Sequence, residues 1–133
     1  MKVLVAEKIA NNGIERLLEK GYEVDELFGL TPAELLKKIG TYDALIVRSN
    51  TQVTPELLAA ASRLKIVGRA GVTVDNIDIP AATEKGIIVC NAPTSNTVST
   101  AEHTMALMLA CARLIPQANA SMKAGRWDRA HLV

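Results

Sequence analysis

The sequence lacks an excess of either charge, closely spaced cysteines and any long apolar run. Its 15 basic and 14 acidic residues leave a net charge of +1, which gives no broad field for nucleic acid or an anionic membrane. Cys90 and Cys111 form no C-x-x-C pair and lie in apolar runs, so we expect small buried side chains. Every apolar run is far shorter than the roughly 18 residues of a membrane span, and no signal-peptide core follows Met1. We therefore expect a cytoplasmic protein that binds neither nucleic acid nor a membrane.

The common catalytic and nucleotide-binding motifs are also missing. No G-x-G-x-x-G follows a strand and opens a helix, and no P-loop is present, which excludes the usual ways of holding a dinucleotide pyrophosphate. His103 lies in an apolar helical segment and His131 in the C-terminal tail, and neither belongs to a Ser-His-Asp or Cys-His arrangement. No residues have metal-ligand spacing. We expect no catalytic residue and no metal site in this chain, so its five βα units look like half of an enzyme.

Short β-rich runs alternate with helical segments along most of the chain. These runs are continuously apolar rather than alternating, as in a parallel sheet covered by helices on both faces. The order therefore predicts βαβ units. The strands are predicted at residues 3–6, 23–27, 44–47, 65–69 and 87–90.

Helix starts are marked by capping signals. Thr31, followed by a proline and then Glu34, predicts a capping box; Thr54 and Asp78 predict two further N-caps. Ser99 and Glu102 predict a fourth start. The segment 101–115 is apolar almost all round, so we expect it to be buried on most sides, with the following proline ending or kinking it.

The candidate site lies where the third to fifth strands end, because open parallel sheets bind ligands outside the carboxyl ends of their strands. Arginine suits phosphate or carboxylate because its planar fork offers paired donors. Glycine lets the backbone approach a ligand, so the amides that follow Gly71 could bind a carboxylate. Salt bridges and a ligand-free tight turn remain the alternatives. The polar residues are Arg48, Ser49, Asn50, Thr51, Arg69, Gly71, Asn76, Asn91, Thr94, Ser95 and Asn96.

Four segments together resemble the D-isomer-specific 2-hydroxyacid dehydrogenase family, in order and over essentially the whole chain. They are VRSNTQVT, VGRAGVTVDNIDIPAATEKGI, NAPTSNTVSTAEHTMALMLACAR and IPQANASMKAGRWDR. The resemblance is greater to the phosphoglycerate branch of the family than to its glyoxylate, lactate or formate branches. It implies a flavodoxin-like, doubly wound, five-stranded parallel sheet of order 2-1-3-4-5, with a long C-terminal helix and arm.

The resemblance also implies a division of labour within the chain. Residues 1–94 would form a substrate-binding domain, and residues 95–133 the interdomain helix and dimerisation arm of a nucleotide-binding domain. The parent enzyme would be an NAD-dependent dehydrogenase acting on a phosphorylated 2-hydroxy acid, and the chain a homodimer through 95–133. The fingerprint and acid–base residues of the family lie beyond this chain, so we expect no tightly bound NAD and no NADH formation by it alone.

Residue roles follow from the same resemblance. Arg48 and Arg69 would hold the substrate phosphate, with Ser49 and Asn50 beside them, and Arg129 would reach a neighbouring subunit's phosphate site. Gly71 and Val72 would offer amides to the carboxylate, Val72 would also touch the nicotinamide end of the cofactor, and Asn96 would border the cleft. Thr73 departs from the family pattern, which usually has a glycine there. The tail AHLV departs from the basic and aromatic pattern expected after Arg129.

Two alternatives to this interpretation stay open. The parent could belong to another branch of the family, such as a glyoxylate or hydroxypyruvate reductase. The chain could instead be a non-catalytic flavodoxin-like binding or dimerisation module. In either case the apolar segment 101–115 should not remain exposed; we expect it to fold back on its own sheet or to pair in a dimer.

Overall fold

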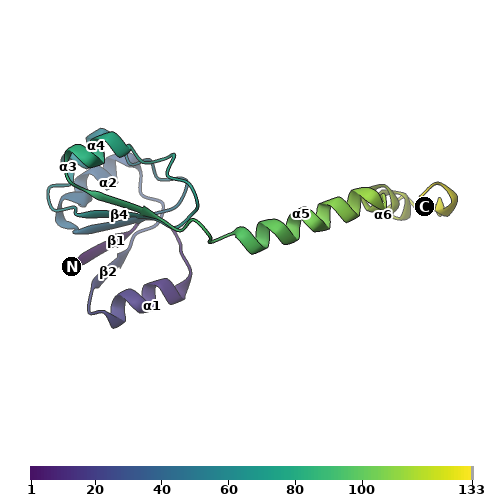
Figure 1. Cartoon of the computed structure of the whole chain (residues 1–133), viewed down its shortest axis with the longest axis horizontal. Coiled ribbons are helices and arrows are strands. Elements are labelled where there is room, and N and C mark those ends of the chain that lie inside the picture. The colour runs from purple at the N-terminus through teal and green to yellow at the C-terminus, as the bar shows by residue number, and fades with distance from the viewer. Residues whose placement is uncertain (133) are drawn as a thin grey trace. The chain divides into compact units, whose positions relative to one another are not determined.

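The computed structural model describes residues 1–132, in which five parallel strands alternate with helices (Figure 1). The strands are β1 (Lys2–Val5), β2 (Glu23–Glu26), β3 (Ala44–Val47), β4 (Ile66–Arg69) and β5 (Ile88–Asn91). The helices are α1 (Asn11–Glu19), α2 (Pro32–Lys38), α3 (Pro55–Ala60), α4 (Ile79–Glu84), α5 (Thr97–Ala112) and α6 (Ile115–Lys123), with short 3-10 turns η1 (Ile39–Thr41) and η2 (Arg129–His131).

The sheet has the order β2-β1-β3-β4-β5 and every pair in it is parallel. This confirms the predicted flavodoxin-like sheet, and each predicted strand lies within two residues of the observed one. The register pairs Val47 with Arg69 and Arg69 with Asn91. The carboxyl ends of β3, β4 and β5 therefore lie at one edge, as the sequence predicted.

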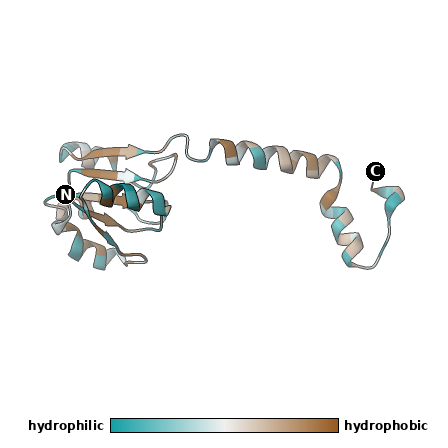
Figure 2. Cartoon of the chain, turned by 90° about the horizontal axis from the view of Figure 1, so that it is seen from below, coloured by the Kyte–Doolittle hydropathy of each residue, from teal (hydrophilic) through white to brown (hydrophobic). Residues whose placement is uncertain are grey.

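Helices pack on both faces of the sheet, which explains why its inner strands β1, β3 and β4 are mostly apolar on both sides. On one face α1 packs over Val3, Val5 and Ala44. The other face carries α2, α3 and α4 over the larger core, which includes Leu45 and Val67. Figure 1 shows α1 on one side of the strands and the other three helices opposite, and Figure 2 shows the strands as mostly hydrophobic.

Three of the four predicted helix starts are confirmed. The side chains of Thr31, Thr54 and Asp78 each accept a hydrogen bond from the backbone three residues on, and Glu34 completes the box at Thr31. The fourth prediction was wrong, because α5 begins at Thr97 and Ser99 lies inside it. Here the capping-box pattern fell within a segment that already had strong helical character.

The prediction that both cysteines are buried was also wrong. Cys90 lies on β5, the edge strand, on the same face as Ile46. The helix that covers this face, α1, packs at β2, at the opposite end of the sheet. Cys111 lies on α5, which has no buried residue. An apolar sequence environment therefore did not translate into burial at either cysteine.

The chain divides into two compact units, Met1–Ser95 and Asn96–Val133. In the second unit α5 packs against α6. Leu114 separates the two helices in a left-handed conformation, with φ of 48°. Pro116 lies in the first turn of α6, where its missing N–H is not needed. The break therefore falls at residues 113–114, just before the proline that was predicted to end or kink the helix. Among the described residues, every helix is too short or too polar to cross a membrane.

Asp43 links the start of β1 to the loop that follows α3. From its contacts we expect part of the chain's stability to be lost in acid. The carboxylate accepts from the Lys2 amide at 2.8 Å and from Arg63 Nη2 at 3.1 Å. These hydrogen bonds, the backbone one foremost, hold the pKa of Asp43 below its usual range. Their stabilisation is present above the unfolded pKa and is lost as the pH falls through the lower folded value.

We expect Asp43→Asn to lower the urea midpoint at pH 7 and to flatten its decline between pH 5 and 3. Urea denaturation across that pH range measures both. Glu84→Gln, at an exposed position of α4, is the matched control and should follow the parent chain. An Asp43→Asn curve parallel to that of the parent at every pH would contradict the assignment.

Candidate functional site

The loop after β3, residues 48–51, is fixed by a carboxylate from the end of β1. Glu7 accepts hydrogen bonds from the amides of Arg48 at 2.9 Å, Asn50 at 3.2 Å and Thr51 at 2.9 Å. Desolvation raises the pKa of Glu7, but these backbone donors outweigh it and hold the pKa below its usual range. Glu7 is therefore an ionised brace for the loop that carries Arg48.

A buried asparagine braces the same loop from β4's side. Asn76 is 5% exposed, and its Nδ2 donates to the carbonyls of Arg48 at 2.8 Å and Thr51 at 2.7 Å. The loop therefore has its amides bound by Glu7 and its carbonyls bound by Asn76. Neither role was predicted: Glu7 was not counted among the site residues, and Asn76 was named only as part of the polar edge.

Arg48 borders a cavity of about 480 Å³ at the carboxyl ends of β1, β2 and β3. Lys8 and Asn50 also line it, over an apolar floor that includes Leu35 and Leu57. Within the described residues 1–132, Arg69 is not part of this lining. The exposed Arg48 side chain is thus available at the sheet edge on a loop whose backbone is held in place.

Arg69, the last residue of β4, turns its side chain back over its own loop. Nη1 lies 2.7 Å from both the carbonyl oxygen and the hydroxyl of Thr73, and Nη2 lies 3.5 Å from Asp75 Oδ1. Thr73 in turn donates its hydroxyl proton to Asp75. That hydrogen bond, more than any other contact, holds the pKa of Asp75 below its usual range. The threonine that departs from the family pattern is therefore a partner of the arginine.

Gly71 lies directly beneath this guanidinium. A Cβ built on Gly71 would be 3.0 Å from Arg69 Nη1, which is too close for an unchanged side-chain position. The Gly71 amide donates to the Arg69 carbonyl at 2.9 Å, and its carbonyl accepts from Ala92. Val72 is 37% exposed, and its carbonyl accepts from Asn91 Nδ2 at 2.5 Å. A Cβ at position 71 would therefore displace the guanidinium by a few tenths of an ångström.

Six of the predicted site residues lie at two neighbouring strand ends of the first unit, but only Arg48 and Asn50 line the cavity described above. Arg48, Ser49 and Asn50 follow β3, whereas Arg69 ends the neighbouring β4 and Gly71 and Val72 follow it.

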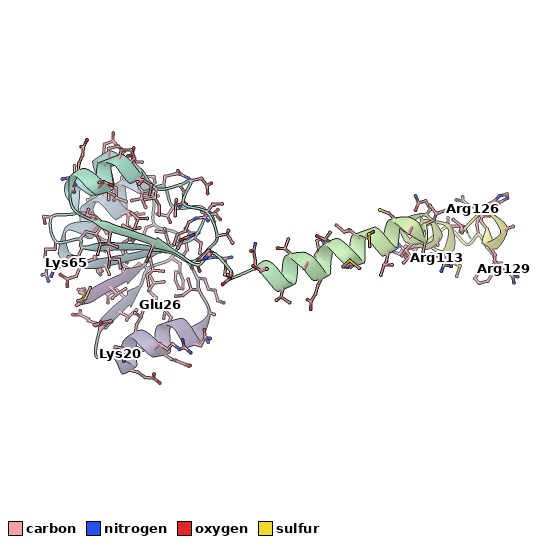
Figure 3. The ribbon with its side chains drawn as sticks, in the orientation of Figure 1. Lys20, Glu26, Lys65, Arg113, Arg126 and Arg129 are labelled. Atoms are coloured by element: carbon pink, nitrogen blue, oxygen red, sulfur yellow. The ribbon has the colours of Figure 1, made fainter. Side chains whose placement is uncertain are left out.

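The remaining two predicted residues belong to the second unit. Asn96 precedes α5 as its N-cap without a side-chain hydrogen bond, and its carbonyl accepts from Thr100. Arg129 begins η2 and lines a small cavity of about 170 Å³ with Trp127. Figure 3 shows Arg126 and Arg129 in this part of the chain. Buried Ser121 donates to Asp128 Oδ2 at 2.7 Å and so fixes the turn before Arg129.

Chemically, the first unit offers cations and amides at a sheet edge. Among residues 1–132, no group of three or more His, Cys, Asp or Glu side chains is arranged to hold a metal. This arrangement defines an α/β domain with arginines at the carboxyl edge of a flavodoxin-like sheet.

Comparison with known proteins identifies the family. Residues 3–126 match the family described as D-isomer specific 2-hydroxyacid dehydrogenase, catalytic domain. The chain belongs to this family. It is 55% identical over 129 residues to D-3-phosphoglycerate dehydrogenase of Archaeoglobus fulgidus, and 56% identical over 129 residues to that of Methanocaldococcus jannaschii. In both cases the match covers 97% of this chain but 24% of the relative, so the chain spans about a quarter of their length.

Solved structures show the same relationship. The TT0316 protein of Thermus thermophilus is 36% identical with a TM-score of 0.88, and the match covers all of this chain and 44% of that protein. The NAD+-bound 3-phosphoglycerate dehydrogenase of Entamoeba histolytica is 32% identical with a TM-score of 0.73, over 83% of this chain and 38% of that one.

Proposed function

We propose that this chain is the substrate-binding part of a D-3-phosphoglycerate dehydrogenase, which oxidises 3-phosphoglycerate with NAD at the start of serine synthesis. The observation that carries this proposal is the pairing of Val47 with Arg69, which sets Arg48 and Arg69 at neighbouring strand ends. Two guanidinium groups suit a dianionic phosphate better than an unphosphorylated hydroxy acid. The names of the relatives support the same substrate.

The chain's own contribution is to bind and orient the substrate. Arg48 and Arg69 hold the phosphate, with Ser49 and Asn50 beside them, and the loop at Gly71 and Val72 receives the carboxylate. Fixing both ends of the substrate aligns its hydroxyl-bearing carbon for reaction. Asn96 borders the cleft and Arg129 serves a neighbouring subunit's phosphate, through a homodimer formed by the second unit.

The cofactor would supply the hydride acceptor when bound. Residues 1–132 contain no strand followed by a G-x-G-x-x-G helix start, so they do not fit the pyrophosphate. The half-exposed Val72 is the one residue we assign to the nicotinamide end. We therefore propose that this chain alone binds no NAD tightly and has no dehydrogenase activity.

Titration of the chain with 3-phosphoglycerate and with D-glycerate, which lacks the phosphate, tests the proposal. We expect binding of 3-phosphoglycerate to be at least about tenfold tighter, and Arg48→Met to remove about tenfold of that affinity. Arg16→Met, on exposed α1, is the matched control and should bind like the parent chain. Equal affinity for the two compounds would contradict a phosphate site and favour another branch of the family.

A further inference from the structure

The guanidinium of Arg69 is only partly satisfied by its own loop. Its side chain is 9% exposed, so its donors need partners. The two contacts of Nη1 with Thr73 account for the two protons of that nitrogen. Asp75 lies 3.5 Å from Nη2, a loose contact, and Asp75 itself is 74% exposed. Nε is buried and has no hydrogen-bond partner among the described residues.

The unsatisfied atoms lie on one edge of the guanidinium. The Nε proton and one Nη2 proton of an arginine point in parallel, which is the geometry that binds two oxygens of a carboxylate or phosphate. A buried donor without a partner costs free energy until an acceptor reaches it. An anion would therefore satisfy the Nε–Nη2 edge, which is the edge that Thr73 does not contact. At present only Nη2 of this edge has an acceptor nearby, the exposed Asp75 carboxylate.

We propose that Thr73 and Asp75 set the anion affinity of Arg69 in opposite directions. Thr73 is a positioning residue that holds Nη1 and so fixes the orientation of the Nε–Nη2 edge. Asp75 is a built-in competing carboxylate that an incoming phosphate displaces from Nη2. The proposal rests on the assignment of Arg69 to the substrate phosphate.

The charges and the hydrogen bonds explain why the two effects differ in sign. A phosphate brings up to two negative charges and two oxygens to the edge, whereas Asp75 offers one oxygen at a long distance from a solvent-exposed position. Exposed ion pairs of this kind contribute little and are readily exchanged. By contrast, without the Thr73 hydroxyl, Nη1 loses one of its two acceptors, and the guanidinium can rotate away from the anion.

Titrations of the 133-residue chain with inorganic phosphate and with 3-phosphoglycerate test this, followed through the Nε resonance of Arg69 in nuclear magnetic resonance spectra. Thr73→Val, which has the same shape without the hydroxyl, should weaken anion binding about fivefold. Thr73→Ser should restore it. Asp75→Asn should strengthen binding roughly threefold, because it removes the competing charge. Thr83→Val and Glu84→Gln, both at exposed positions of α4, are the matched controls.

A merely structural role for the loop would make both variants bind more weakly, so weaker binding in Asp75→Asn would overturn the proposal, as would unchanged binding in Thr73→Val. The two ligands separate this inference from the proposed function. Opposite effects on inorganic phosphate, with 3-phosphoglycerate bound no more tightly than phosphate, would support the Thr73–Asp75 pair and contradict the substrate. Tight binding of 3-phosphoglycerate, without opposite effects of the Thr73→Val and Asp75→Asn variants, would support the substrate and contradict the role of the Thr73–Asp75 pair.

Discussion

Glu7→Ala is expected to destabilise the first unit by about 2 kcal/mol and to weaken phosphate binding at Arg48. The substitution leaves three amides without their shared carboxylate. A hydrogen bond to a charged group contributes about 1.5–3 kcal/mol when buried, and solvent reduces this at the half-exposed Glu7. Thermal denaturation measures the loss of stability. Hydrogen exchange at the amides of Arg48 and Thr51 shows whether it is confined to this loop.

The sign of the pH dependence gives a second measurement. Because the folded pKa of Glu7 lies below its ordinary value, its stabilisation is present above the unfolded pKa and is lost as the pH falls through the folded one. Stability of the parent chain and of Glu7→Ala should therefore converge toward low pH. Glu15→Ala, an exposed glutamate on α1, serves as the control. A Glu7→Ala variant as stable as this control at pH 7 would show that the brace contributes nothing.

The contrast between Glu7 and Thr31 shows what the sequence could predict. The Thr31 cap joins residues three apart, so its pattern is visible in four letters of sequence. The Glu7 brace joins residues 41 to 44 apart, and it exists because β1 and β3 are neighbours in the sheet. Once β1 and β3 are taken as neighbours, an acid directly after β1 facing a loop after β3 becomes a recognisable signal.

The contact between Thr73 and Arg69 was also not predicted, although it spans only four residues. The reason therefore differs from that for Glu7. Whether the arginine side chain extends to an external anion or folds onto its loop depends on loop backbone that follows no regular period. The resemblance to the family identified Arg69 and Gly71 as site residues, but it predicted an amide donor at Gly71. The structure shows that the absence of a Cβ at Gly71 makes room for the guanidinium.

The exposed apolar side chains of helix α5 lead to the second prediction, which concerns dimer formation. Val98, Met105 and Met108 are 70%, 53% and 54% exposed, and with Ala101 and Ala112 they follow one another at intervals of three and four residues. This is the seam spacing of two helices packed side by side, and the alanines allow close approach. We therefore expect the homodimer proposed above to form through this stripe.

Met105→Glu combined with Met108→Glu should weaken that dimer by at least about 100-fold, because each copy would bury two carboxylates in place of side chains that contribute about 1.5–3 kcal/mol each. Light scattering across a dilution series measures the change. Leu18→Glu, at a 53% exposed position on α1, adds one carboxylate to the first unit and should leave the dimer intact. A parent chain that stays monomeric at every concentration would contradict the dimer and favour α5 folding back on its own sheet.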